Sequence, residues 1–199
     1  FWSSAVPSYF LKPALIKESP DFIIFHHGHL ERGRGIMRLI KAIPYIKDTN
    51  NKIVLKIAGN GTLSKEIKQL SFQKKYKLKF LGQIDHKNII DFIDSAKLCV
   101  IPFDNSVGNA TSSPLKLMEY IARDKSIIAT KLENFVNDFS DYSKLYYMDN
   151  NNPESIAKSI DSYILNYNNL TPISNEGHNI IKRKFTWELQ AKKINNFLE

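Results

Sequence analysis

Short apolar runs alternate along this chain with segments that have the periodicity of an amphipathic helix. The first run, at residues 22–25, contains only Phe and Ile, and apolar residues then recur at helical spacing between Ile36 and Ile43. Strands that alternate with helices form βαβ units, whose parallel sheet is covered by helices on both faces. We therefore predict an α/β fold with further strands at 53–58, 78–81, 98–101 and 127–129, and a weaker pattern at 145–147.

Glycines mark the places where these predicted strands end. Gly28 follows the first strand, residues 59–61 (Gly-Asn-Gly) the second, Gly82 with Gln83 the third, and a glycine-containing loop at 103–113 the fourth. Ligands of open parallel sheets bind beyond the carboxyl ends of the strands. Glycine permits tight turns and close approach of a ligand to the backbone. One such turn is common, but several along one edge predict a ligand cleft.

A helix start after the fourth strand has features of an anion site. Ser113 is a favoured N-cap, and Pro114 suits the first helical position. The free N–H groups of Leu115 and Lys116, with the positive end of the helix dipole, would then face a phosphate. Glu119, one turn behind, would suit ribose hydroxyls, so the segment fits a nucleotide. The alternative is an ordinary capped helix with a solvated glutamate.

The positive charge of the chain is unevenly distributed. The net charge is +8, and residues 31–79 contain 13 Lys or Arg against 3 Asp or Glu. Such a surplus indicates an anionic partner, namely nucleotide phosphates, an acidic membrane surface or nucleic acid. The alternative is a set of solvated helix faces. No nucleic-acid-binding motif accompanies the lysines, so we do not expect a nucleic-acid partner.

Cysteine content and apolar runs indicate a cytoplasmic protein. Cys99 is the single cysteine, which excludes a disulfide framework, and its apolar neighbours predict that it is buried. No apolar run has the length of a membrane span. Residues 1–7 do not have the pattern of a signal peptide, and we expect them to follow a cut inside a longer protein.

The end of the chain is predicted to be helical. A start signal at residues 152–154 precedes isoleucines at a spacing of four, and Thr186 can cap a last helix. We expect one domain, 1–199, whose terminal helix at 186–198 docks either on its own domain or on a second one. The apolar stripe of that helix would consist of Trp187, Ala191, Ile194 and Leu198.

Several of these segments together resemble family 4 glycosyltransferases. Residues 28–36, Gly-His-Leu-Glu-Arg-Gly-Arg-Gly-Ile, resemble the family's G-R-x(4)-K-G segment. Other segments follow in the family's order, namely 55–61, 80–82, the Ser-Pro-Leu-Lys-Leu-Met-Glu-Tyr string at 113–120, and 185–188, which resembles the family's closing helix. The resemblance extends over about residues 22–198.

The resemblance implies a Rossmann-like domain, the C-terminal half of a GT-B glycosyltransferase. That half binds the sugar nucleotide, here a UDP- or GDP-sugar, and an N-terminal domain of the same enzyme holds the acceptor. It implies retaining transfer without a metal or other cofactor. The implied setting is bacterial polysaccharide or glycolipid synthesis in the cytoplasm, peripheral to the anionic inner face of the membrane. The isolated chain would be inactive.

The resemblance also assigns roles to individual residues. Arg34 takes the place of the family's diphosphate lysine, and Glu119 matches the glutamate that binds ribose; these two are the expected catalytic residues. His29 stands where the family has a second cation, a loss for which Arg32 would compensate, and Thr111 replaces the family's first glutamate. The other expected donor-binding residues are Gly28, Gly82, Gln83, Ser112, Ser113, Pro114, Leu115 and Lys116.

Three other interpretations remain open. A GT-B sugar-nucleotide epimerase would share the fold but use a cluster of acidic and histidine side chains, and the sequence reveals none. A non-catalytic basic module would bind nucleic acid or a membrane. His26, His27 and His29 invite a metal site, but no neighbouring carboxylate or cysteine completes a ligand set, so no metal is expected.

Overall fold

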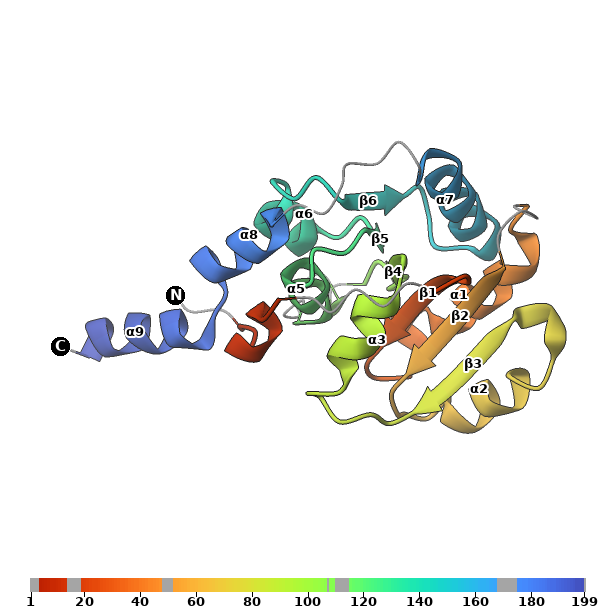
Figure 1. Cartoon of the computed structure of the whole chain (residues 1–199), viewed down its shortest axis with the longest axis horizontal. Coiled ribbons are helices and arrows are strands. Elements are labelled where there is room, and N and C mark those ends of the chain that lie inside the picture. Colours follow the sequence, from red (N-terminus) through yellow and green to blue (C-terminus); the bar gives the residue numbers. More distant parts are fainter. Residues whose placement is uncertain are drawn as a thin grey trace.

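The predicted parallel sheet is present, with six strands in the order β3-β2-β1-β4-β5-β6. The computed structural model describes residues 4–13, 19–47, 52–106, 108–109, 115–167 and 175–198. Figure 1 shows the twisted sheet running through the molecule. Its strands are β1 (Phe22–His27), β2 (Ile53–Ala58), β3 (Leu78–Gly82), β4 (Leu98–Ile101), β5 (Ile127–Thr130) and β6 (Leu145–Met148).

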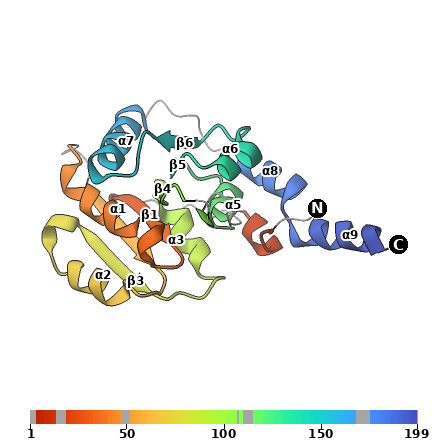
Figure 2. The same cartoon turned by 180° about the vertical axis from the view of Figure 1, so that it is seen from behind.

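Helices cover both faces of this sheet, as the alternation predicts. Apolar side chains of α1, α2 and α7 pack on one face, and those of α3, α5, α6 and α8 on the other. Figure 2, from behind, brings the first group forward. The helices are α1 (Ile36–Ala42), α2 (Ser64–Leu70), α3 (Ile89–Ser95), α5 (Leu115–Ala122), α6 (Glu133–Phe139), α7 (Pro153–Asn166), α8 (Glu176–Lys184) and α9 (Trp187–Leu198), with short 3-10 helices η1 (Ser8–Leu11), η2 (Arg32–Arg34), η3 (Ile43–Tyr45) and η4 (Lys74–Tyr76).

Burial on two faces explains why the strands have continuous apolar sequences. Every residue of β1 is buried, and its side chains alternate between the two cores. Phe22 and Ile24 contact the core under α1 and α7, whereas Ile23 and Phe25 contact the core under α3 and α5. Cys99 on β4 is fully buried, as expected of a small apolar residue.

The strand order reverses between β1 and β4, and this reversal creates a crevice at the carboxyl edge. The chain leaves β1 toward β2 and β3 on one side, and β4 to β6 lie on the other. Connections therefore diverge at this point, where open α/β sheets bind ligands. Gly35 lets the chain pass close to the end of β4, because a Cβ there would lie 1.6 Å from the Pro102 carbonyl oxygen.

Thr186 and Thr62 lie near the starts of two helices and have different roles. The Leu189 N–H donates to Thr186 Oγ1 at 3.3 Å, which confirms Thr186 as a cap of α9. Thr62 is not the cap of α2, since that position belongs to Leu63. The Thr62 hydroxyl instead donates to the Glu31 carboxylate, which also accepts the Thr62 N–H at 3.0 Å. The Glu31 carboxylate, from the segment after β1, therefore binds the hydroxyl that could otherwise cap the helix. This contact joins two loops at the carboxyl edge of the sheet.

The N-terminal segment is fixed to the core by a buried ion pair. Arg123, at the end of α5, donates to both oxygens of Asp94 at 2.8 and 2.6 Å, and to the Phe10 carbonyl at 2.8 Å. Phe10 is itself fully buried, and Val6 forms a parallel bridge with Thr186. These contacts place residues 4–13 beside α5, close to the carboxyl edge of the sheet.

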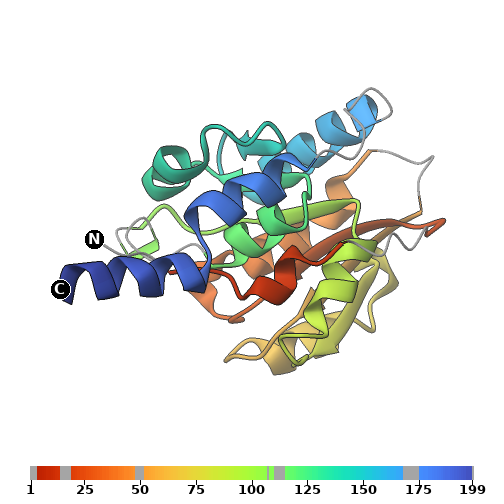
Figure 3. The ribbon, with the colours of Figure 1, turned by 60° about the vertical axis from the view of Figure 1, so that its left-hand side comes forward.

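The last helix leaves the body of the protein. Figure 3 shows α9 extending beyond the sheet and its covering helices. Gln190 is the buried residue of this helix, whereas Trp187, Phe197 and Leu198 are exposed. Within the described part of the chain, no helix combines the length and apolar character that crossing a membrane requires.

Replacing Arg123 with Met removes the cation and leaves Asp94 as an uncompensated buried charge. We expect R123M to lower the free energy of unfolding by about 3–5 kcal/mol, measured by urea denaturation. The matched control is K184M, because the Lys184–Asp141 pair lies about half exposed on the surface and should contribute less than about 1 kcal/mol. Equal losses in the two variants would contradict a structural role for the buried pair.

Candidate functional site

A hollow of about 480 Å³ opens at the carboxyl edge of the sheet, beside the crevice between β1 and β4. It lies at the ends of the first three strands, where the glycine turns predict a ligand cleft. Its walls come from the segments after β1, β2 and β3, namely His27, Gly28, His29, Glu31, Ala58, Gly59, Asn60, Gly61, Gln83, Ile84, His86 and Ile89.

Glu119 on α5 is buried behind this hollow, and two histidines hold its carboxylate. It is 5% exposed, which excludes the interpretation as a solvated glutamate. Its Oε1 lies 2.5 Å from His86 Nε2, and its Oε2 lies 3.1 Å from His27 Nε2. The Tyr9 hydroxyl lies 2.6 Å from the other ring nitrogen of His86. The result is a continuous chain of polar contacts, Tyr9–His86–Glu119–His27.

The two histidines differ in their electrostatic state. Burial alone would raise the pKa of Glu119, but hydrogen bonding to His27 and His86 brings it down to about 2. Burial lowers the pKa of His27, which outweighs the opposing effect of Glu119. The hydrogen bond to Glu119 raises the pKa of His86. Glu119 is therefore a carboxylate at neutral pH. It is held by the imidazole of His27, which favours the neutral form, and by that of His86, which binds a proton more readily than an ordinary histidine.

The sequence did not reveal this cluster, so the expectation that no acidic and histidine side chains meet is wrong. His86 lies in the loop after β3 and Tyr9 in η1, far along the chain from Glu119. His27 was considered only as a metal ligand. The one available signal was the placement of His86 shortly after Gly82 and Gln83, at a strand end where ligand-binding residues gather.

Two cations lie across the crevice between β1 and β4. The Arg34 guanidinium is 4.8 Å from the centre of the Phe103 ring and donates to Asn109 Oδ1 at 2.9 Å. The Lys116 ammonium is 4.7 Å from the same ring. The Lys116 side chain passes over Gly28, where a Cβ would come within 2.8 Å of its Nζ. Among the described residues, neither cation forms an ion pair with a carboxylate.

The other expected donor-binding residues are spread over the site and its surroundings. Three of them line the hollow, namely Gly28, His29 and Gln83. Gly82, with a φ of 68°, directly precedes Gln83 in the chain. Arg32 and Leu115 are exposed. Four further residues lie outside the described part of the chain, namely Thr111, Ser112, the predicted N-cap Ser113, and Pro114.

The three neighbouring histidines do not converge on one point. His26 and His27 follow each other in β1, so their side chains lie on opposite faces of the sheet. His26 Nδ1 contacts the Val100 carbonyl at 2.8 Å, whereas His27 contacts Glu119. In the part of the chain that the structure describes, no group of three or more His, Cys, Asp or Glu side chains is arranged to hold a metal ion.

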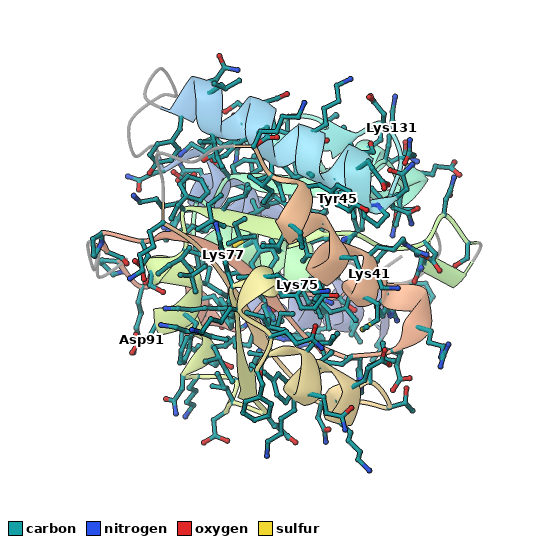
Figure 4. The ribbon with its side chains drawn as sticks, turned by 90° about the vertical axis from the view of Figure 1, so that its right-hand side faces the viewer. Lys41, Tyr45, Lys75, Lys77, Asp91 and Lys131 are labelled. Atoms are coloured by element: carbon teal, nitrogen blue, oxygen red, sulfur yellow. The ribbon has the colours of Figure 1, made fainter. Side chains whose placement is uncertain are left out.

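Most of the surplus lysines lie away from the hollow. Lys41 on α1 and Lys75 and Lys77 around η4 are visible on the face in Figure 4. Lys75 and Lys77 precede β3, so they lie at the amino edge of the parallel sheet, opposite the hollow. The charge of residues 31–79 is therefore divided between the site, through Arg34, and a separate basic surface.

The sequence matches a family model over most of its length. The model described as glycosyl transferases group 1 matches residues 10–184. An uncharacterized glycosyltransferase of Methanocaldococcus jannaschii is 24% identical over 185 residues, which are 91% of this chain and 45% of that protein.

Solved structures of glycosyltransferases have the same fold. A glycosyltransferase from Rickettsia africae aligns with a TM-score of 0.78 and 16% identity, over 98% of this chain and 55% of that one. HepE of Anabaena, in complex with UDP and glucose, aligns with a TM-score of 0.71 and 16% identity, over 90% of this chain and 48% of that one. The chain thus spans about half the length of these relatives, and the Rossmann-like sheet matches structures of the GT-B fold.

The contact between His86 and Glu119 predicts a pH dependence of stability. Because the pKa of Glu119 is lowered, its contribution is present above about pH 4.5 and is lost as the pH falls toward 2. Because the pKa of His86 is raised, its contribution is complete below about pH 6.5 and is lost as the pH rises through the folded pKa. We therefore expect H86Q to reduce the free energy of unfolding most, relative to the unchanged protein, between about pH 4.5 and about pH 6.5.

The measurement is urea unfolding of both proteins from pH 5 to pH 9. The loss should stay below about 1 kcal/mol, because half of the His86 side chain is exposed and solvent screens the pair. H178Q, which removes a histidine of α8 outside the hollow, is the matched control. A loss in H86Q that stays constant across the range would contradict a charge contact with Glu119.

Proposed function

The chain belongs to the glycosyl transferases group 1 family, and on this premise we propose that it binds a sugar nucleotide, UDP- or GDP-linked, at the carboxyl edge of its sheet. The observation that carries the proposal is the pairing of a buried carboxylate with a nearby cation. Glu119 lies behind the hollow, and Arg34 lies in the crevice beside it. Among the described residues, Arg34 has no carboxylate partner. Carboxylates accept hydrogen bonds from ribose hydroxyls, and guanidinium groups bind phosphate oxygens. A nucleoside diphosphate matches both.

Glu119 would meet the ribose after a side-chain rearrangement. Both of its oxygens are engaged, one by His27 and one by His86. His27 is buried within β1, whereas half of the His86 side chain is exposed. His86 therefore is the partner that can turn away and release an oxygen to the ribose hydroxyls. The backbone at Gly28 and Gln83, which line the hollow, and at the adjacent Gly82 would then border the base and ribose.

Arg34 would act on the leaving group. Sugar transfer leaves a nucleoside diphosphate, on which negative charge increases as the bond to the sugar breaks. A fixed guanidinium stabilises that charge, and contacts with Phe103 and Asn109 hold Arg34 in place. We propose that protein cations fulfil this role without a metal ion or other cofactor.

The whole enzyme would contain more than the chain described here. We propose that this chain is the C-terminal, donor-binding half of a retaining glycosyltransferase, with an N-terminal domain that holds the acceptor. Exposed Trp187, Phe197 and Leu198 on the extended α9 offer an apolar surface for that domain. The coverage of 45% of the archaeal relative supports a second half of similar size.

The proposed setting is bacterial polysaccharide or glycolipid synthesis on the cytoplasmic face of the membrane. A basic surface at the amino edge of the sheet supports peripheral contact with anionic lipids. Lysines line a second hollow there, of about 420 Å³, and Phe72 nearby is 77% exposed. The lysines are Lys52, Lys74, Lys77 and Lys79.

An epimerase of the same fold is a second candidate, favoured by one observation. His27, Glu119 and His86 form the kind of acidic and histidine cluster that sugar-ring chemistry requires. The family match favours the transferase. Conversion of a UDP-sugar to its epimer by the chain alone would support the epimerase instead.

The nucleotide site can be tested by calorimetric titration with UDP and GDP. We expect one of them to bind with a dissociation constant in the micromolar range, and E119A to weaken binding at least about tenfold, equivalent to about 1.4 kcal/mol. E188A removes an exposed glutamate of α9 and is the matched control. Salt-dependent binding of a short oligonucleotide, with no affinity for either nucleotide, would contradict the proposal and favour a basic binding module.

The half-enzyme proposal predicts that the isolated chain does not transfer sugar. Without an acceptor domain, nothing positions the attacking hydroxyl, and positioning supplies a large share of the rate. Radiolabelled UDP- or GDP-sugar, incubated with the chain and membrane extract, should yield no glycosylated product. Sustained turnover by the chain alone would contradict this domain assignment without affecting the proposed nucleotide site.

A further inference from the structure

We propose that Lys116 supplies the second cation for the donor diphosphate, reaching the crevice from α5 where His29 provides no fixed charge. This inference rests on the proposed function, since it concerns the same nucleotide. The helix-start pattern gave the backbone N–H of Lys116 as a phosphate donor and assigned no role to its side chain. The structure gives its side chain a separate position beside Arg34.

The position of the ammonium is set by two elements that border the crevice. Lys116 starts on α5, passes over Gly28 at the end of β1, and ends 4.7 Å from the ring of Phe103, which follows β4. These two strands are the ones between which the strand order reverses. The ammonium therefore lies across the ligand crevice of the fold.

Gly28 allows this path, because any side chain would block it. A Cβ at Gly28 would lie 2.8 Å from Lys116 Nζ and 2.9 Å from its Cε. The backbone of Gly28 also has a φ of +121°, which L-residues with side chains rarely adopt. Gly28 therefore has a second role besides shaping the turn, since it leaves room for the cation.

Lys116 and Arg34 together form a positive site that has no matching anion among the described residues. Both cations contact the one buried ring of Phe103. Among the described residues, no carboxylate pairs with either cation, and the carboxylate of Glu119 is engaged by His27 and His86. Two like charges held at one ring repel each other, and a diphosphate would remove that repulsion.

The other basic residues near the first turn do not fill this position. Arg32 is exposed on η2 and makes no contact with Phe103, and His29 is exposed at the hollow. Lys116, from a helix that follows β4, therefore supplies the charge in this proposal.

The electrostatic environment of Lys116 yields a measurable consequence. Burial and the charge of Arg34 lower the pKa of Lys116 to about 7, against a smaller opposing effect of Glu119. Among the neighbouring titratable groups, His26 and His27 of β1 have their pKa values lowered first by burial and further by the charge of Lys116. A bound diphosphate favours the charged amine, so its pKa would rise. At pH 8 the free amine is mostly neutral, and binding should take up close to one proton.

The experiment is calorimetry of UDP and GDP binding at pH 8 in two buffers of different ionisation enthalpy, which gives the proton uptake directly. We expect the unchanged chain to take up close to one proton. K116R should keep its affinity within about threefold but take up none, because a guanidinium stays charged. K116M should bind at least about tenfold more weakly. K131M, which removes an exposed lysine labelled in Figure 4, should match the unchanged chain.

Two outcomes separate this inference from the proposed function. If K116M binds the nucleotide as tightly as the unchanged chain, with the same proton uptake, the role of Lys116 is wrong and the nucleotide site stands. Inorganic pyrophosphate serves as a second probe that lacks the nucleoside. Pyrophosphate could bind with a proton uptake that K116R abolishes, while neither UDP nor GDP binds. In that case the cation site stands and the proposed function is wrong. Urea unfolding of K116M verifies that the variant is folded.

Discussion

The reversal of strand order between β1 and β4 is the constraint on which the site depends. It leaves an opening at the carboxyl edge that no connection crosses, and loops from both halves of the sheet border it. Arg34 comes from the half that begins with β1, whereas Phe103 and Lys116 come from the segments after β4. The cations meet only because the two halves are joined edge to edge in one sheet. On one face of the sheet, the buried pair of Arg123 and Asp94 then joins the end of α5 to α3.

The four central strands were predictable because each must bury two faces, and this leaves a continuous apolar sequence. The run at 53–58 coincides with β2, and that at 98–101 with β4. Helix α6 was not predicted, whereas α8 lies within the end of the chain that was predicted to be helical. The role of Thr62 could not be deduced, since a hydroxyl can cap a helix or bond a carboxylate from a distant loop, and only the fold brings Glu31 within reach.

The site was predictable as a location but not as a set of contacts. Gly28, Gln83 and Glu119 lie where the strand ends and the family pattern place them. The partners of Glu119 could not be deduced, because Tyr9 and His86 reach it from other elements with no periodic spacing to α5. The same holds for Lys116, whose side chain has a position that depends on the absence of a Cβ at residue 28. Local patterns report burial and turns, whereas such contacts follow from packing over long sequence separations.

The two parts of the site differ in whether residues of the protein already bind their charged groups. Glu119 already has two imidazole partners, so both of its oxygens are engaged before any ligand arrives. Arg34 and Lys116 share one aromatic ring and lack an anionic partner among the described residues. On the proposed function, a diphosphate therefore gains most from the cations, whereas the ribose must displace His86 to gain a hydrogen bond. Affinity would come chiefly from the phosphates, and the recognition of the nucleoside would carry the cost of opening the His86–Glu119 contact. A nucleoside without phosphates should accordingly bind far more weakly than pyrophosphate, because it pays for that opening without the charge neutralisation that offsets it.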